Sequence, residues 1–221
     1  MVRCSARPRA GNMHVAVAGA GGFIGRHMVT ALAAAGHEVS AFTRKPVDLP
    51  GCRVVVADGG GVEAFRDGLG TRAVDAFVNL AATGVNPGQR DLDQLLGTNT
   101  LLPAQLVKLA AENGCRAFIQ IGSSAEYAAT AHSVPIDEAS PLERRALYGA
   151  SKAAGSLMAQ ATGRAVGVPV ALLRAFNVFG PGEAPHRLLP SLHERLGRGE
   201  KVALSAGSQI RDFLYVHDAC A

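Results

Sequence analysis

The sequence is poor in aromatic residues and has no closely spaced cysteines, and both features limit the classes of protein to which it can belong. Among 221 residues there is no tryptophan and there are only three tyrosines. The cysteines are Cys4, Cys52, Cys115 and Cys220, with no Cys-x-x-Cys pair and no histidines clustered at metal-ligand spacing. Such spacing indicates neither a disulfide framework nor a zinc site. We therefore expect no metal, and a reducing, cytoplasmic setting.

Long apolar runs and runs of basic residues are also absent. No run approaches the roughly 18 apolar residues of a membrane-spanning helix. Residues 1–12 contain three arginines and no apolar core of a signal peptide, so we expect a flexible N-terminal tail and no membrane contact. The net charge is +4, but the basic residues are scattered and do not alternate with aromatic ones, which argues against nucleic acid. The charge favours binding of an anionic small molecule.

From His14 onward, short apolar runs alternate with longer amphipathic ones. This alternation predicts an α/β fold, a doubly wound parallel sheet (Rossmann) with helices on both faces. The predicted strands are 14–18, 38–43, 53–57, 76–79, 117–121 and 168–174, and the predicted helices are 23–35, 62–69, 91–112 and 147–166. These elements form one predicted dinucleotide-binding domain, residues 13–174.

After Arg174 the pattern changes. The sequence predicts a turn-rich loop over 177–182, a helix over 186–197, and short strands over 201–204 and 213–216. We interpret residues 175–221 as a small, partial substrate-binding region that follows the main domain.

A glycine-rich turn follows the first predicted strand and opens the first predicted helix. Gly19 lets the backbone turn, Gly22 lets it approach a pyrophosphate, and Gly25 lets the helix pack on the sheet. The free amides at the start of the helix, at Phe23 and Ile24, can bind the phosphate oxygens. A merely tight turn is the alternative, but the strand–turn–helix context predicts a dinucleotide site.

Two further positions bear on which dinucleotide is bound. At the end of the second strand, an acid would bind the ribose 2′-hydroxyl of NAD, but Thr43-Arg44-Lys45 stands there. Arg44 can hold a 2′-phosphate through two hydrogen bonds, which favours NADP(H) and leaves NAD(H) as the second option. Two solvated surface cations are the alternative. Asp58, just after the third strand, can accept a hydrogen bond from the adenine amino group or simply cap the strand.

The ends of the fourth and fifth strands supply further candidates, because ligands of such sheets lie beyond the carboxyl ends of the strands. Ala81 belongs to a small-residue segment that leaves space for the nicotinamide ribose. Ser124 can donate a hydrogen bond to a substrate carbonyl or alkoxide oxygen, and a turn or helix-cap serine is the alternative.

Tyr148 and Lys152 stand one helical turn apart, on one helix face. A lysine there is expected to lower the pKa of the phenol toward the range of a general acid/base. An exposed helix face is the alternative. Their order after the glycine turn and the serine pair favours proton transfer beside a hydride carrier.

With these motifs placed, residues 14–218 resemble the extended short-chain dehydrogenase/reductase family of nucleotide-sugar epimerases, dehydratases and ketoreductases. The resemblance also rests on Asn99 and on the segments 174–182 and 211–218. It implies that Asn99 belongs to the cofactor site and that Lys152 holds the nicotinamide ribose. It further implies that Asn177 and Arg211 lie near the diphosphate of a nucleotide sugar, for which arginine is suited by its planar charge. Family members commonly dimerise through a helix pair, which implies a homodimer.

The sequence departs from the family pattern in two places. The family usually continues for several dozen residues that help form the sugar-nucleotide pocket, so this chain is either part of a longer protein or naturally short. We therefore expect it to bind cofactor well and nucleotide sugar weakly. In sugar 4,6-dehydratases a Thr-Asp-Glu or Thr-Ser-Glu triplet stands where this chain has Ser124-Ala125-Glu126. Ala125 cannot act as an acid, although Glu126 can still be a base, so dehydration is disfavoured.

The sequence thus predicts an NAD(P)-dependent enzyme acting on a nucleotide-activated sugar. A 4-keto-6-deoxyhexose reductase is favoured, because Ser-Ser-Ala-Glu-Tyr resembles the ketoreductase and mannose-dehydratase branch. One alternative is a 4-epimerase of the same fold, with no net redox turnover. The other is a cofactor-binding module or sensor without turnover, against which the intact Tyr148 and Lys152 argue.

Overall fold

The computed structural model describes residues 11–59, 61–86, 88, 90–129 and 135–221. The expected flexible tail over 1–12 lies outside the described residues except for Gly11 and Asn12, which are exposed.

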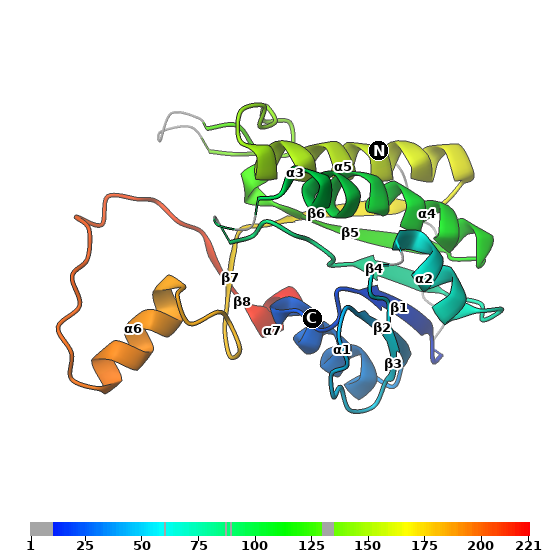
Figure 1. Ribbon diagram of the computed structural model, residues 1–221, viewed down its shortest axis with the longest axis horizontal. Coiled ribbons are helices and arrows are strands. Elements are labelled where there is room, and N and C mark those ends of the chain that lie inside the picture. Colours follow the sequence, from blue (N-terminus) through cyan, green and yellow to red (C-terminus); the bar gives the residue numbers. More distant parts are fainter. Residues whose placement is uncertain (1–10, 60, 87, 89, 130–134) are drawn as a thin grey trace.

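A six-stranded parallel sheet forms the centre of the molecule (Figure 1). The strands are β1 (His14–Ala18), β2 (Glu38–Thr43), β3 (Arg53–Val56), β4 (Ala76–Asn79), β5 (Ala117–Ser123) and β6 (Val170–Ala175). Their order is β3-β2-β1-β4-β5-β6, so the winding direction reverses between β1 and β4. This order confirms the predicted doubly wound sheet. Such sheets bind ligands beside the reversal, at the carboxyl ends of the strands.

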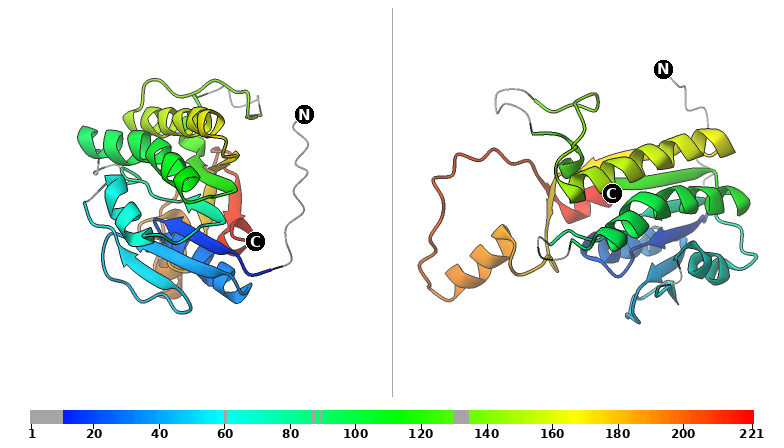
Figure 2. Two further views of the ribbon diagram at one scale, coloured as in Figure 1. Left: turned by 90° about the vertical axis from the view of Figure 1, so that its right-hand side faces the viewer. Right: turned by 45° about the horizontal axis from the view of Figure 1, so that its top comes forward.

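Helices cover both faces of the sheet (Figure 2). On one face lie α1 (Phe23–Ala34) and α7 (Val216–Ala219). On the other lie α2 (Gly61–Leu69), α3 (Leu92–Gln94), the π-helical segment η1 (Leu95–Leu101), α4 (Leu102–Glu112) and α5 (Leu147–Val166). A short 3₁₀ turn, η2 (Ser124–Glu126), follows β5. Among the described helices, none has both the length and the apolar composition that crossing a membrane requires.

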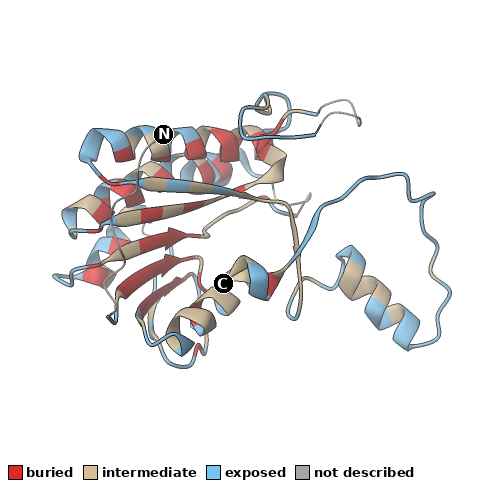
Figure 3. Cartoon of the chain, turned by 180° about the vertical axis from the view of Figure 1, so that it is seen from behind, coloured by how far each residue is buried: buried red, intermediate tan, exposed pale blue. Residues whose placement is uncertain are grey.

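Two buried apolar clusters join these layers, and Figure 3 shows the buried strands between the helices. In the larger cluster, Leu106 of α4 packs with Phe77 and Phe118, whose rings stack 5.4 Å apart. In the other, Val29 of α1 packs with Val17 of β1. Each fully buried side chain of this size contributes about 1.5–3 kcal/mol. The strands whose ends form the candidate site are therefore held in a well-packed core.

The chain beyond β6 forms a smaller part. β7 (Asn177–Phe179) and β8 (Phe213–Tyr215) pair in parallel, while α6 (Leu188–Gly197) and the segment after it extend away from the central sheet (Figure 1). Every residue of α6 is at least partly exposed.

Two local predictions for this part are wrong. Residues 201–204, expected as a strand, have no regular structure, because a short strand needs a pairing partner to be stable. The expected loop over 177–182 instead begins with β7, which β8 pairs with from far along the chain.

Candidate active site

The glycine-rich turn between β1 and α1 brings backbone groups so close together that side chains would clash. We call this turn, with Gly19, Gly22 and Gly25, the glycine cradle. Gly19 has φ +77°, and a Cβ there would lie 2.8 Å from the backbone nitrogen of Ala81. A Cβ at Gly25 would overlap the Gly19 carbonyl oxygen, so α1 packs against the turn only because this residue is glycine. The N-cap residue Gly22 has no side chain to occupy the amides of the first turn, which begins at Phe23. Close backbone and a helix N-terminus fit a pyrophosphate.

Arg44 lies just after β2, is exposed, and lines a cavity of about 590 Å³. Arg90, which the sequence analysis did not single out, lines the same cavity, as does Asp91, whose carboxylate caps the first turn of α3. Two guanidinium groups in one polar cavity suit an anionic group such as a 2′-phosphate. Asp58 is exposed just beyond the end of β3. The roles of Arg44 and Asp58 in cofactor binding stay predictions.

Tyr148 and Lys152 reach the carboxyl end of β5 from the first turns of α5. Gly149 permits this approach, because a Cβ there would overlap the carbonyl oxygen of Ala125. Lys152 is 4% exposed, and its Nζ donates to the Ile121 carbonyl at 2.8 Å. Burial lowers the pKa of Lys152, while the charge of Glu126 acts in the opposite direction.

The pKa of Tyr148 is raised, mainly because burial disfavours the charged phenolate. A hydrogen bond with the Ser123 side chain lowers this pKa, the charge of Glu126 raises it, and Arg187 lowers it. The expectation that Lys152 lowers the pKa of the Tyr148 phenol is therefore wrong. Burial has the largest effect on this pKa, and the Lys152 ammonium group donates to a backbone carbonyl.

Ser123 also bears on Tyr148, because its side chain lowers the pKa of the phenol, and the sequence analysis missed this residue. Ser123 ends β5 and is the N-cap of η2, where its hydroxyl accepts from the backbone of Ala125 at 3.1 Å. The signal was present, because Ser123-x-x-Glu126 is a capping-box pattern. Ser124 is half-buried in the next position, and its contact with substrate stays a prediction.

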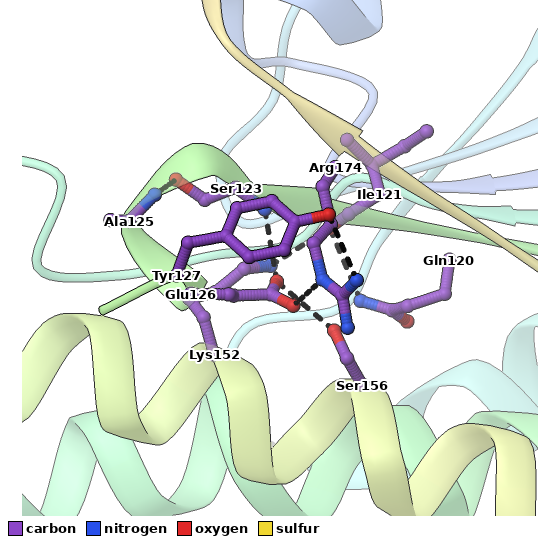
Figure 4. A network of polar contacts seen from close by, with 9 residues as sticks. All are labelled: Gln120, Ile121, Ser123, Ala125, Glu126, Tyr127, Lys152, Ser156 and Arg174. Carbon is purple, nitrogen blue, oxygen red and sulfur yellow. Dashed lines mark hydrogen bonds and ion pairs between the residues drawn. The ribbon is translucent and has the colours of Figure 1, made fainter. Parts of the chain in front are cut away.

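Behind Ser123 lies a buried network centred on Glu126 (Figure 4). Glu126 Oε1 accepts from the Ser123 backbone at 2.9 Å and from Ser156 Oγ at 3.0 Å. Its Oε2 pairs with Arg174 Nε at 2.9 Å. Arg174 Nη1 also donates to the Tyr127 hydroxyl at 3.1 Å, and the guanidinium carbon lies 4.8 Å from the centre of the Tyr127 ring. Both Glu126 oxygens are thus engaged within the protein.

Asn99 is buried in the π-helical segment η1. Its amide exchanges hydrogen bonds with the backbone of Thr83, at 2.9 and 3.0 Å, and donates to Ser151 Oγ at 3.1 Å. A Cβ at Gly155 would overlap the Asn99 carbonyl oxygen, so α5 and η1 lie in close contact. Asn99 therefore fixes the segment after β4 to α5, next to Lys152. Its membership of the cofactor site stays a prediction.

The structure also brings Asn177 and the segment at Arg211 together. Ser123 of β5 pairs with Ala175 of β6, and Asn177 follows two residues later. Asn177 Nδ2 donates to the Asp212 carbonyl at 3.0 Å, which places exposed Arg211 beside it along the chain. Contacts of either residue with a diphosphate stay predictions. Within the described ranges, no group of His, Cys, Asp or Glu side chains could hold a metal ion.

Comparisons with known proteins agree with this architecture. The family model described as NAD dependent epimerase/dehydratase family matches residues 15–221. A dTDP-glucose 4,6-dehydratase of Streptomyces griseus is 29% identical over 235 residues, covering 93% of this chain and 66% of that protein. The matches span between 19% and 66% of the length of these curated relatives.

Two solved structures show the same fold. MoeE5 in complex with UDP-glucose and NAD is 30% identical, with a TM-score of 0.79 over 95% of this chain and 69% of that one. UDP-N-acetylglucosamine 4-epimerase from Methanobrevibacter ruminantium, in complex with UDP-N-acetylmuramic acid, is 25% identical, with a TM-score of 0.79 over 95% and 71%.

Proposed function

Because the chain belongs to the NAD dependent epimerase/dehydratase family, we propose that it is an enzyme that transfers hydride between a nicotinamide cofactor and a nucleotide-activated sugar. One observation carries the proposal. The glycine cradle at Gly19, the half-buried Tyr148 and the buried Lys152 stand at the carboxyl ends of strands of one sheet. A similar structure that binds UDP-glucose and NAD supports it.

In the proposed reaction, each residue of the site has a separate role. When bound, the nicotinamide ring supplies the hydride that reduces a sugar carbonyl carbon. Tyr148 gives its phenolic proton to the carbonyl oxygen and later regains a proton from solvent. Ser123, and Ser124 beside it, orient that oxygen. Lys152 has three N–H donors, of which Ile121 takes one, so the others can hold ribose hydroxyls.

A 4-keto-6-deoxyhexose linked to a nucleoside diphosphate is the substrate we favour. Elimination of water from the sugar needs an acid and a base beside the phenol, and Ala125 has no acidic group. Glu126 is fully buried, and both its oxygens bind other residues. Reduction needs neither group, because the hydride and the phenolic proton complete it. Asn177 and Arg211 are proposed to hold the diphosphate.

A 4-epimerase is the second candidate, and the same Ala125 and Glu126 geometry favours it over a dehydratase. An epimerase oxidises and re-reduces one carbon, so it consumes no cofactor. The similarity to a UDP-N-acetylglucosamine 4-epimerase supports this option. A binding module without turnover would have no need of the Tyr148 and Lys152 pair.

For the cofactor we propose NADP(H) rather than NAD(H). The cavity after β2 is lined by Arg44 and Arg90, and its one acid among the described residues, Asp91, accepts a hydrogen bond from the Gln94 backbone as the N-cap of α3. The similar structure with UDP-glucose contains NAD, so the choice between the two cofactors depends on these arginines.

The test is a panel of nucleotide-linked 4-keto sugars and 4-hydroxy sugars, followed by nicotinamide absorbance and by product analysis. Net oxidation of NADPH with a keto sugar supports the reductase. Inversion at C4 without net oxidation supports the epimerase. Tight cofactor binding with no conversion of any sugar would contradict both and leave the binding module.

We also propose that two copies of the chain pair through α4 and α5, which lie side by side on one face of the sheet (Figure 2). Three large apolar side chains on η1 and α5 support this, because Leu101, Leu157 and Met158 are each about half exposed.

A further inference from the structure

His27, on the second turn of α1, contacts a segment 154 residues further along the chain. Its Nε2 lies 2.8 Å from the Pro181 carbonyl oxygen. A carbonyl oxygen can only accept, so Nε2 carries the proton and donates it. The imidazole is half-buried. This contact joins the helix that follows the glycine cradle to the turn that follows β7, and the proposed proton transfer does not use it.

Two aromatic rings pack against the His27 imidazole. The centre of the Phe23 ring lies 5.8 Å away, and Phe23 is the first residue of α1, next to the N-cap Gly22. The centre of the His217 ring, on α7, lies 5.0 Å away. Aromatic pairs at such distances stabilise a structure beyond the area that they bury. The imidazole is therefore held both by the start of α1 and by α7, which lies beside α1 in Figure 1.

The turn after β7 packs closely on the start of α7. A Cβ at Gly180 would lie 2.5 Å from Val216 Cγ1, and Val216 is 0% exposed. Because β7 and β8 also pair, the two strands, this turn and α7 form one body, which we call the β7–β8 unit. Asn177 begins β7, and Arg211 lies two residues before β8. Both residues proposed to hold the diphosphate therefore belong to the β7–β8 unit or adjoin it.

One cavity is lined both by α1 and by the β7–β8 unit. It has a volume of about 540 Å³, and its lining includes Ile24 of α1, Val178 of β7 and Leu214 of β8. Ile121 and Arg174, near the carboxyl ends of β5 and β6, line it as well. The distance between α1 and the β7–β8 unit therefore sets the width of this cavity. The hydrogen bond from α1 to the turn after β7 fixes that distance.

We propose that His27 is a positioning residue for the nucleotide sugar. Its hydrogen bond to Pro181 holds the β7–β8 unit, and with it Asn177 and Arg211, against the helix whose start is the proposed pyrophosphate site. The groups that meet the sugar nucleotide thus keep their place relative to the cofactor. This inference rests on the proposed function for the identity of the ligand, while the contact itself does not depend on it.

Two variants separate the hydrogen bond from the ring. His27→Phe keeps a flat ring beside Phe23 and His217 but has no N–H donor, so the β7–β8 unit should loosen. His27→Gln keeps an N–H donor near the position of Nε2, so it should restore most of the lost order. Thr30→Val is the matched control, because Thr30 is exposed on the same helix and its hydroxyl donates to the Arg26 carbonyl of that helix.

Hydrogen exchange followed by mass spectrometry, without any ligand, measures the order of the β7–β8 unit. Peptides that cover 177–182 and 213–219 should exchange about 3–10-fold faster in His27→Phe, the scale of one hydrogen bond, and β1 and β4 should not change. Titration calorimetry then measures the affinities for UDP-glucose, dTDP-glucose and NADPH. His27→Phe should weaken binding of the two nucleotide sugars by about 3–10-fold and leave that of NADPH unchanged, because the glycine cradle is intact.

Faster exchange and weaker nucleotide-sugar binding in His27→Phe, with both restored in His27→Gln and neither seen in Thr30→Val, support the proposal. Unchanged exchange would overturn it, because the hydrogen bond would then not hold the β7–β8 unit. Faster exchange with unchanged nucleotide-sugar affinity, or with an equal loss of NADPH affinity, would also overturn it and leave the contact a purely structural one. Failure of the unmodified protein to bind either nucleotide sugar would count against the proposed function alone, and the exchange measurement would still decide whether His27 holds the unit.

Discussion

At the scale of single residues, the proposed reaction depends on one phenol whose surroundings keep it protonated. Burial raises the pKa of Tyr148, and the Lys152 ammonium group donates a hydrogen bond to the Ile121 carbonyl. A raised pKa suits a group that must donate a proton to a developing alkoxide. Because the phenol stays protonated below its raised pKa, reduction should persist through neutral pH and fall only as the pH rises toward that pKa.

Tyr148→Phe should lower turnover by about 10²–10⁴-fold, the range for losing a general acid/base. Cofactor affinity should change little, because the ring and the glycine cradle remain. Turnover and NADPH affinity are measured in parallel, with Tyr215→Phe on β8 as the matched control. Turnover close to that of the unmodified protein would remove Tyr148 from the mechanism.

Arg44→Ala should reduce the preference for NADPH over NADH by about 1–3 kcal/mol, the scale of a charge-assisted contact with a phosphate. The loss should fall on NADPH alone, since NADH has no 2′-phosphate. Titration calorimetry with both cofactors measures it, and Arg72→Ala, on the surface near Glu38, is the control. Equal affinities of the unmodified protein for NADPH and NADH would show that the cavity does not bind the 2′-phosphate.

At the scale of elements, the site is held by close contacts between backbones, and these need glycine. Gly155 of α5 faces the carbonyl oxygen of Asn99 in η1, and Thr100 Oγ1 donates to the Ser151 carbonyl at 3.1 Å. These contacts lie one turn or less from Lys152. The distance between α5 and η1 therefore sets where the lysine stands relative to the strand ends.

Gly155→Ala should destabilise the protein by about 1–3 kcal/mol, because the added methyl group would overlap the backbone carbonyl of Asn99. Gly97→Ala in η1 is the matched control, since a Cβ there would meet open space. Urea unfolding of both variants gives the free energies. A Gly155→Ala protein as stable as the control variant would show that the two segments can move apart freely.

Much of the sheet could be predicted from sequence because its signals are local. Apolar runs and the glycine turn indicate β1 and α1 without knowledge of the rest of the chain. The π-helical segment could not be predicted in this way, because its contacts with α5 join residues far apart in sequence. The same holds for Glu126 and Arg174, which are 48 residues apart and meet only once β5 and β6 pair.

At the scale of the whole molecule, the outer surface of η1 and α5 is more apolar than a solvated helix face requires. Leu101, Leu157 and Met158 are 57%, 51% and 49% exposed. Clusters of exposed large apolar residues commonly mark interfaces. Because α5 carries Tyr148 and Lys152 near its start, an interface along it would also stiffen the helix that holds the proposed catalytic pair.

Leu157→Glu should therefore weaken self-association by about 100-fold or more, since a charge would be buried at the interface without a partner. Sedimentation equilibrium over a range of concentrations measures the dissociation constant. Leu204→Glu is the matched control, because Leu204 is 64% exposed in the segment after α6, away from the helix pair. A monomer at every concentration, or a dimer that Leu157→Glu leaves intact, would contradict pairing through α4 and α5. Dissociation that also lowers the turnover of each copy would show that the interface supports the helix carrying Tyr148.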